Sequence, residues 1–509
     1  MTLQTTLTQV LEENAKQKEE ISSLRQSLTY VEEQLAWFKR QIFGPRSEKT
    51  IKNLNQPNFF EEGFGLTSNP KAEEKQPVPA HERKKPNRNG KDTIKLPEDL
   101  PVERQVIDIP EEEKICSETG KPLVEIGEEV TLKLAHKPGS YYLKEIVRPK
   151  YALPQKSEGG IRIAPLPESL LTRCQADDSL LADILTKKFA DHLPLYRQVE
   201  MLAREGIYIS RQTLSQWVVR AGMALEPLYD ELIRQIINSD NVFIDETPID
   251  MLAPGKGKTH KAFMWVMCGG KEKDPPYRVY DFYTNRKHAN AEKLIEGYHG
   301  VVHSDKYGAY EGLANAKKII WCPCWTHIRR KFIEAESGDV KFKAWVLRKI
   351  RHLFMYEKVA WARSEEERLR IRLEKEVPII DELIHAIKHI LVEGQILPKS
   401  KYREALGYFC GLIPHLKNYT LHAYARLDNN VAERAVRPLA IGRKNWLFVG
   451  NEDGGKAAAI LFSLVQTCRA IGGNPREYLT DVMRRLMSHN AQKLDELLPD
   501  RWLASRATP

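Results

Sequence analysis

Two aspartates directly follow short apolar runs that have the composition of buried strands. Asp245 comes after Val242–Ile244, and Asp305 ends the run that begins at Val301. A carboxylate at the end of a buried strand is costly unless a cation or a hydrogen-bond donor satisfies it. The pattern therefore suggests a cation or donor site at these positions, although an aspartate that caps its own turn would look the same.

The segments around the two aspartates predict a mixed sheet. The first strand is the β-branched and aromatic run at 241–244, and Thr247-Pro248 is expected to end it. The elements that follow are strands at 261–268 and 277–283, a helix at 290–298, strands at 301–305 and 319–321, and a helix rich in arginine and lysine. In such a sheet Asp245 and Asp305 lie at strand ends, where polar ligands gather.

A third acid, Glu433, lies much later in the chain. The segment 427–437 predicts a helix that is capped near Asp428 and ended by Pro438. Arg434 and Arg437 lie on the same predicted helix. A solvated surface of glutamate and arginine is the alternative interpretation of this segment.

Taken together and in order, several short motifs resemble the transposase family of insertion sequence 66. These motifs are Phe43–Lys49, Asp245–Pro248, His303–Gly308, Cys324–Phe332, Asp428–Arg434 and Gly442–Phe448. Each motif is weak alone, but the ordered set spans most of the chain and is specific. The resemblance implies a ribonuclease-H-like fold with an Asp-Asp-Glu metal site.

The resemblance also implies the chemistry. Asp245, Asp305 and Glu433 would be the catalytic and metal-binding residues, holding two Mg²⁺ (or Mn²⁺) ions, with Asp245 between them. Such ions activate an oxygen nucleophile and stabilise a leaving oxygen. The implied reaction is DNA cleavage at the element ends, followed by transfer of the freed 3′ hydroxyls into target DNA.

Two other functions remain open from the sequence. One is a nuclease of the same fold that acts on branched or hybrid nucleic acid. The other is a catalytically silent DNA-binding protein derived from a transposase. The joined DNA products of a transposase would distinguish it from both.

Several cationic and polar side chains are candidates for DNA contact, and a plain surface charge is the alternative for each. The candidates are Arg211, Gln212, Ser215, Lys306, Arg329, Arg330, Lys331, Arg434, Arg437, Arg443 and Lys444. Cys322, Cys324 and His327 invite a metal site, but structural zinc usually has four ligands and two-residue cysteine spacing. We therefore expect no zinc and a structural role for these three residues.

The pattern as a whole predicts a multidomain α/β plus α protein. The predicted parts are a coiled coil (1–43), a flexible basic linker (44–101), a small β-rich unit (102–156), a helical DNA-binding domain (157–238), a ribonuclease-H-like catalytic domain (239–450) with a helical insertion at about 340–425, and C-terminal helices (451–509). An a/d heptad seam over residues 3–42 predicts self-association, most simply as a dimer. An amphipathic helix packed on its own chain is the alternative.

The β-rich unit resembles a family zinc module that has lost its ligands. Cys116 is the one cysteine that remains there, and one thiolate does not make a tetrahedral zinc site. We expect a zinc-free, zinc-finger-like remnant. In the next domain a Gly-containing turn and the Ser210-capped segment after it predict a helix-turn-helix in which Leu214 and Trp217 pack inward. A helical hairpin without DNA contact is the alternative.

Composition restricts the possible kinds of protein less than the motifs do. The chain has 509 residues, a formal charge of +9 and seven cysteines, which together favour several domains, a polyanionic partner and a reducing compartment. There is no apolar stretch near the roughly 20 residues of a membrane span. The expectation is a bacterial cytoplasmic protein that binds DNA (terminal inverted repeats and target), self-associates and works with or without small accessory proteins of the same element.

Overall fold

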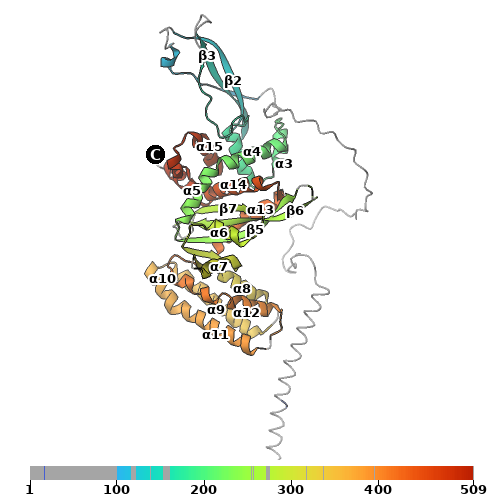
Figure 1. The fold of residues 1–509 in the computed structure, drawn as a ribbon, viewed down its shortest axis with the longest axis vertical. Coiled ribbons are helices and arrows are strands. Elements are labelled where there is room, and N and C mark those ends of the chain that lie inside the picture. Colours follow the sequence, from blue (N-terminus) through green and yellow to red (C-terminus); the bar gives the residue numbers. More distant parts are fainter. Residues whose placement is uncertain are drawn as a thin grey trace, which may run out of the picture.

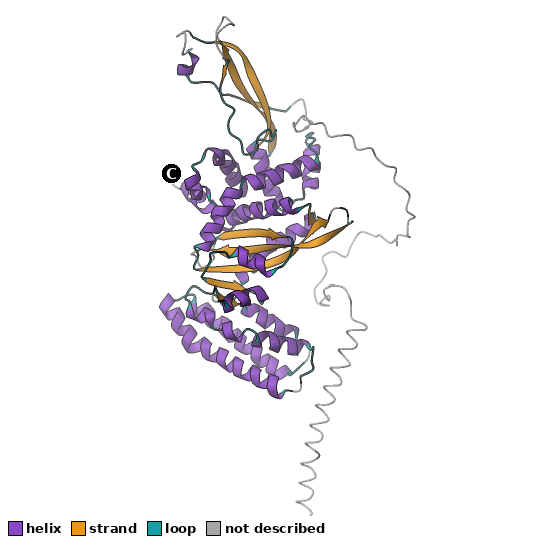
Figure 2. Ribbon diagram, viewed as in Figure 1, coloured by secondary structure: helices purple, strands orange, loops and turns teal. Residues whose placement is uncertain are grey.

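The computed structural model describes residues 100–507, except 116–121, 138, 153–160, 254, 256, 271–275, 317, 336–337 and 395, and also Gln17. Apart from Gln17, the predicted coiled coil lies outside the described residues, as do nearly all of the predicted linker and Cys116. The described part combines two sheets with many helices (Figure 2). It is therefore a mixed α/β structure, as the sequence predicts.

A small sheet forms the N-terminal part of the described chain and projects from the rest of the molecule (Figure 1). It contains β1 (Val102–Val106), β2 (Val124–Lys137), β3 (Ser140–Ala152) and β4 (Arg162–Ile163), with the short helix η1 (Glu111–Lys114). Strands β2 and β3 pair antiparallel along their whole length, whereas β1 pairs parallel with β3. Ile109, Tyr151 and Ala164 form a small separate core beneath this sheet.

Four helices follow: α2 (Asp178–Phe189), α3 (Leu195–Arg204), α4 (Arg211–Ala224) and α5 (Glu226–Ile237). The turn between α3 and α4 contains Gly206 with a φ of 75°, a conformation that glycine adopts without strain. Ser210 caps α4, because its hydroxyl oxygen accepts the Thr213 N–H at 3.0 Å. Leu214 and Trp217 are 0% and 1% exposed, which confirms that they pack inward.

The central sheet has the strand order β7-β6-β5-β8-β9, and β10 (Phe448–Val449) pairs with the far part of β5. Its strands are β5 (Asn241–Ala253), β6 (Lys258–Gly269), β7 (Tyr277–Tyr283), β8 (Val301–Ser304) and β9 (Ile320–Pro323). The first three strands are antiparallel, whereas β8 and β9 run parallel to β5. The predicted strands therefore all exist.

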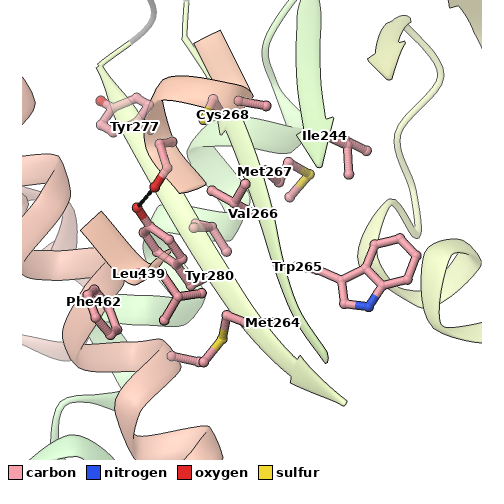
Figure 3. Close-up of a cluster of buried hydrophobic side chains, with 14 of the residues drawn as sticks. Ile244, Met264, Trp265, Val266, Met267, Cys268, Tyr277, Tyr280, Leu439 and Phe462 are labelled. Atoms are coloured by element: carbon pink, nitrogen blue, oxygen red, sulfur yellow. Dashed lines mark hydrogen bonds between the residues drawn. The ribbon is translucent and has the colours of Figure 1, made fainter. Parts of the chain in front are cut away.

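Helices cover both faces of this sheet. On β6 the side chains alternate, so Val266 and its neighbour Tyr280 on β7 face α13 (Asn430–Trp446) and α14 (Glu452–Ala470), whereas Trp265 faces the other side (Figure 3). Tyr280 donates its hydroxyl hydrogen to the backbone carbonyl of Ala435 at 2.5 Å. The short helices α6 (His288–Leu294) and α7 (Gly308–Asn315) cover the second face, where Trp265 contacts Tyr310.

Two prolines do not end elements as expected. Pro248 lies inside β5, between the residues that pair with β8 and those that pair with β10, so its missing N–H can face an open strand edge. Pro438 lies inside α13, which is 17 residues long and continues beyond this proline to Trp446. Burial of Val431, Ala435 and Leu439 on one face of that helix offsets the loss of one backbone hydrogen bond.

The chain between β9 and α13 is helical, as its composition predicts. It contains α8 (Trp325–Glu334), α9 (Val340–Ala360), α10 (Glu365–Ile371), a π-helical turn η2 (Arg372–Glu376), α11 (Val377–Glu393), α12 (Lys401–Cys410), η3 (Ile413–His415) and η4 (Asn418–Leu421). Arg372 is fully buried there and forms an ion pair with Glu357 at 2.6 Å. It also donates to the backbone carbonyls of Tyr419, His422 and Ala425. These helices thus hold the segment that leads into α13.

The C-terminal helices after α14 are α15 (Pro475–Arg485), η5 (Leu486–Ser488), η6 (Ala491–Leu497) and α16 (Pro499–Ala507). Helix α14 runs through the core between β7 on one side and α4 on the other. Within the described residues, no helix is both long enough and apolar enough to cross a bilayer.

Candidate active site around three acidic side chains

The three predicted catalytic acids lie on three elements that meet at one place. Asp245 is in β5, just beyond the residues that pair with β8, and Asp305 directly follows β8. Glu433 is in the first turn of α13. Asn429, which precedes this helix, donates its side-chain amide to the carbonyl of Ile244 at 2.8 Å. This bond brings the beginning of α13 to the part of β5 that carries Asp245.

The acids are close enough for their charges to raise the pKa of Asp245 and of Asp305. Burial raises the pKa of Asp245 to about 8, and the Glu246, Asp305 and Glu433 carboxylates add to the rise. Burial also raises the pKa of Asp305, and Glu433 adds to this rise, whereas His327 and Arg286 oppose it. Three carboxylates that repel one another in a buried site favour a bound cation.

Two carboxylate oxygens in this group lack hydrogen-bond donors. Asp305 Oδ1 and Glu433 Oε1 are buried, and no described residue donates to either. Asp245 Oδ1 accepts one bond, from the Glu246 backbone N–H at 2.9 Å. Buried oxygens of this kind are normally satisfied. Carboxylate oxygens are also the ligands that hard divalent cations prefer, so the residues present fit a Mg²⁺ site.

A fourth acid, Glu246, lies beside this group and was missed from the sequence. Its side chain is 4% exposed and forms an ion pair with Arg286. Burial, followed by the Asp305 carboxylate, raises the pKa of Glu246 to about 7, and Arg286 opposes this rise. The Arg286 guanidinium lies 4.4 Å from the centre of the Tyr307 ring. In the sequence, only the adjacent acids Asp245 and Glu246 hint at this fourth acid. Its partner Arg286 comes from a loop after β7, so the pairing has no sequence pattern.

On the Glu433 side, the beginning of α8 contributes two metal-ligand side chains, Cys324 and His327, and one cation, Arg330. His327 Nδ1 lies 3.7 Å from Glu433 Oε1, and Arg330 lies 3.9 Å from the other carboxylate oxygen. The Cys324 thiol, the His327 ring and the Glu433 carboxylate each place a ligand atom within 4.8 Å of the other two. The sequence had suggested Cys322 as a companion of Cys324, but the third member of this group is Glu433.

The cations near the acids that were predicted to contact DNA differ in their exposure and in their partners within the chain. Lys331 is paired with Glu404 at 2.8 Å, and Lys306 donates to the carbonyl of Tyr408 at 3.4 Å. Arg443 donates to the Thr247 hydroxyl and to the carbonyl of Pro248, each at 2.6 Å. These three side chains therefore make contacts within the chain. Arg329 is half-buried on α8, and Arg434, Arg437 and Lys444 are exposed on α13.

The other three candidates lie away from the acids. Arg211, Gln212 and Ser215 are exposed near the beginning of α4. This helix packs chiefly against α14, and also against α2 and α3, rather than against β5 or β8. The structure therefore brings Asp245, Asp305 and Glu433 together and leaves the α4 residues as a separate surface.

Three family models match this chain. Residues 173–457 match the family described as "Transposase IS66 family", and residues 463–499 match the "IS66 C-terminal element". Residues 31–104 match "Transposase C of IS166 homeodomain". That last match covers the end of the predicted coiled coil and all of the predicted linker. A homeodomain-like region is therefore matched where composition favours a flexible segment. The first match contains all three acids and α4.

The chain also resembles proteins of Sinorhizobium fredii along much of its length. It is 30% identical to protein y4jD over 507 residues, which cover 96% of this chain and 97% of the relative. It is 32% identical to protein y4qI, with coverage of 75% and 72%, and 30% identical to protein y4hP, with coverage of 92% and 88%. All three relatives are described as uncharacterized. Together with the family matches, these similarities confirm the resemblance seen in the motifs: the chain belongs to the IS66 family of transposases.

Proposed function

We propose that this transposase cleaves DNA at the ends of its element and transfers the resulting 3′ hydroxyls into target DNA. In this proposal Asp245, Asp305 and Glu433 are the catalytic acids. The observation that carries it is the meeting of these three side chains from distant parts of the chain: burial, and then the carboxylates of Glu246, Asp305 and Glu433, raise the pKa of Asp245. Perturbed carboxylates grouped in this way mark functional sites more often than structural ones.

The sheet supports a ribonuclease-H-like core. Its three antiparallel strands are followed by two strands parallel to the first, in the order β7-β6-β5-β8-β9. In this arrangement Asp245 on the first strand and Asp305 after the fourth occupy adjacent positions. The helix that carries Glu433 packs against the same sheet. The helical segments from α9 to η4, residues 340–421, are then an insertion between the fifth strand and that helix.

The same three acids would hold two divalent cations, Mg²⁺ or Mn²⁺. When bound, such ions lower the pKa of an attacking water or hydroxyl and neutralise charge on the leaving oxygen. The chain's own part is to supply oxygen ligands from buried positions and to hold them in place. Asn429 supports this arrangement, because it ties Ile244, the residue before Asp245, to the beginning of the Glu433 helix.

DNA is the partner implied by a transposase with a homeodomain-like region. Further support for contact comes from exposed Arg437 and Lys444 on the Glu433 helix and from Arg211 and Gln212 on α4. Cations near an active site position phosphates by charge, whereas a helix in the major groove can read bases. We therefore assign the α13 cations to the reacting strand and α4 to recognition of the element ends.

The proposal is tested with purified full-length protein and DNA fragments that carry the inverted repeats flanking its coding region. With Mg²⁺ we expect cut ends and joined products. Cut ends without joined products would instead support a nuclease. Specific binding without any metal-dependent product would support a silent DNA-binding descendant of a transposase.

A further inference from the structure

A second set of metal-ligand atoms lies on the α8 side of Glu433. It consists of the Cys324 thiol, the His327 ring and the Glu433 carboxylate, whose ligand atoms all lie within 4.8 Å of one another. Asp245 and Asp305 are not part of this set. We propose that Cys324, His327 and Glu433 form a binding site for a thiophilic divalent cation such as Zn²⁺, distinct from the all-oxygen site of the three acids.

The unsatisfied atoms of the set support this proposal. His327 Nδ1 and Glu433 Oε1 are both buried without a hydrogen-bond partner among the described residues, and they lie 3.7 Å apart. That distance is too long for a hydrogen bond. It is close to the separation of two ligands of one tetrahedral ion, which is roughly 3.3–3.6 Å when a nitrogen and an oxygen each lie about 2.0–2.2 Å from the metal. One ion would therefore satisfy both atoms.

The backbone holds the thiol in place at the same point. Cys324 is 1% exposed and precedes α8, and its sulfur accepts the Asn429 N–H at 3.2 Å. The adjacent Trp325 N–H donates to the carbonyl of Leu427 at 3.1 Å. These two bonds join the beginning of α8 to the segment that leads into α13. The ligand positions on α8 and on α13 are therefore fixed relative to each other before any ion binds.

The ligand types indicate which ion the site would take. A sulfur and an imidazole nitrogen select Zn²⁺ or a similar borderline cation, whereas Mg²⁺ prefers oxygen ligands alone. Three protein ligands leave one position of a tetrahedral ion open, as in sites that also bind water or an exchangeable group. Cys322 lies two residues away and is also buried, but it is not part of the set. It therefore provides a matched control.

The site has a consequence that rests on the proposed function. Glu433 belongs both to this set and to the proposed catalytic acids, so a Zn²⁺ ion bound to its Oε1 would withdraw the carboxylate from its catalytic position. We therefore expect Zn²⁺ to inhibit strand transfer in the presence of excess Mg²⁺. Binding itself does not depend on that function and can be measured without DNA.

The test uses the metal-free full-length protein titrated with Co²⁺ and then with Zn²⁺. Co²⁺ should give a thiolate-to-cobalt charge-transfer absorption that Zn²⁺ abolishes. Cys324→Ser should lose this absorption, whereas Cys322→Ser should keep it. His327→Ala and Glu433→Gln retain the thiol and should each weaken Zn²⁺ binding by more than the roughly 10–100-fold that loss of an outer-sphere partner produces. Thermal melting of every variant reports whether its fold is intact.

Three results would overturn the proposal: no thiolate absorption in the wild type, an absorption that survives Cys324→Ser, or unchanged Zn²⁺ affinity in His327→Ala or Glu433→Gln. The inhibition is measured separately, as the ratio of strand transfer with and without Zn²⁺ in wild type and in Cys324→Ser. Zn²⁺ binding in a protein that shows no strand transfer would support this site while contradicting the proposed function. Strand transfer by a wild-type protein that binds no Zn²⁺ would contradict this site while supporting the proposed function.

Discussion

Asn429 donates its side-chain amide to the carbonyl oxygen of Ile244 at 2.8 Å, and its backbone carbonyl oxygen accepts the Glu433 N–H at 3.2 Å. One buried residue therefore connects the strand that carries Asp245 with the helix that carries Glu433. The relative position of these two acids depends on this link more directly than on any other contact described above.

Asn429→Ala should therefore reduce activity more than its effect on stability explains. Loss of the bond leaves the Ile244 carbonyl unsatisfied and should lower the free energy of unfolding by about 1–3 kcal/mol. A displacement of about 1 Å between reacting groups can reduce a rate on the order of 10²-fold. The measurements are chemical denaturation and the rate of Mg²⁺-dependent DNA cleavage.

Asn445→Ala is the matched control, because Asn445 also donates an amide to a backbone carbonyl, that of His192, at the other end of α13. It should lose comparable stability and keep its cleavage rate at temperatures well below unfolding. Equal rates in the two variants would show that Asn429 has no special role in positioning.

Arg372→Met should strongly destabilise the helical region between β9 and α13. Its guanidinium is 0% exposed and paired with Glu357, so the substitution leaves a buried carboxylate without its cation. Removal of one partner from such a pair lowers the free energy of unfolding by about 3–5 kcal/mol. The second substitution Glu357→Leu should restore much of this loss. Chemical denaturation of the single and double variants measures both effects, and a double variant no more stable than the single one would contradict the assignment.

The pH dependence of stability should contain a contribution from Asp178. Burial, followed by the Asp177 carboxylate, raises the pKa of Asp178 to about 6 in the folded protein. An unfolded chain releases this proton at a pH of about 3.9, so the folded state retains the proton over the interval between the two values. The free energy of unfolding therefore falls as the pH rises through that interval, by up to about 3 kcal/mol, and stays lower above it.

Asp178→Asn removes this contribution because the amide does not ionise. Relative to wild type, the variant should gain stability at pH 7.5 and gain less at pH 4, as measured by urea denaturation at both values. A difference that is the same at the two pH values would show that Asp178 does not titrate in this way.

Arg211→Ala should weaken DNA binding without lowering stability, because the side chain is exposed near the beginning of α4. A lost base contact corresponds to about 1–3 kcal/mol of discrimination, whereas a lost phosphate contact reduces the salt dependence of the affinity. Titration of element-end DNA at several salt concentrations distinguishes the two. Arg234→Ala on α5, where the arginine pairs with Glu231, should leave affinity unchanged. Equal affinities for wild type and Arg211→Ala would exclude α4 as the recognition helix.

The sequence predicted most of the central sheet, with Asp245 on its first strand and Asp305 at the end of its fourth. The apolar runs at 241–244 and 301–305 became β5 and β8, because β-branched and aromatic residues favour buried strands. The prediction that two prolines end their elements is wrong at both positions for the same reason. Pro248 and Pro438 each lie where tertiary pairing or packing outweighs the local preference, and a single sequence does not show which strand edges are open or which helix face is buried.

The surroundings of the acids were the least predictable part of the site. Arg286 reaches Glu246 from a loop after β7, and His327 reaches Glu433 from α8. The positions of these residues in the sequence do not indicate that either pair is in contact, because both contacts depend on how α13 and the loops pack on the sheet. The three acids themselves were located by the family motifs rather than by periodicity, and their catalytic roles remain a proposal.

The most direct test of the central claim compares the strand-transfer activity of Asp245→Asn, Asp305→Asn and Glu433→Gln with that of Asp250→Asn, an exposed aspartate on the same strand as Asp245. With Mg²⁺ and element-end DNA, we predict that each of the first three variants retains its fold, measured by circular dichroism, and loses joined product. Asp250→Asn should match wild type. Wild-type levels of joined product in any one of the three acid variants would contradict the proposed active site.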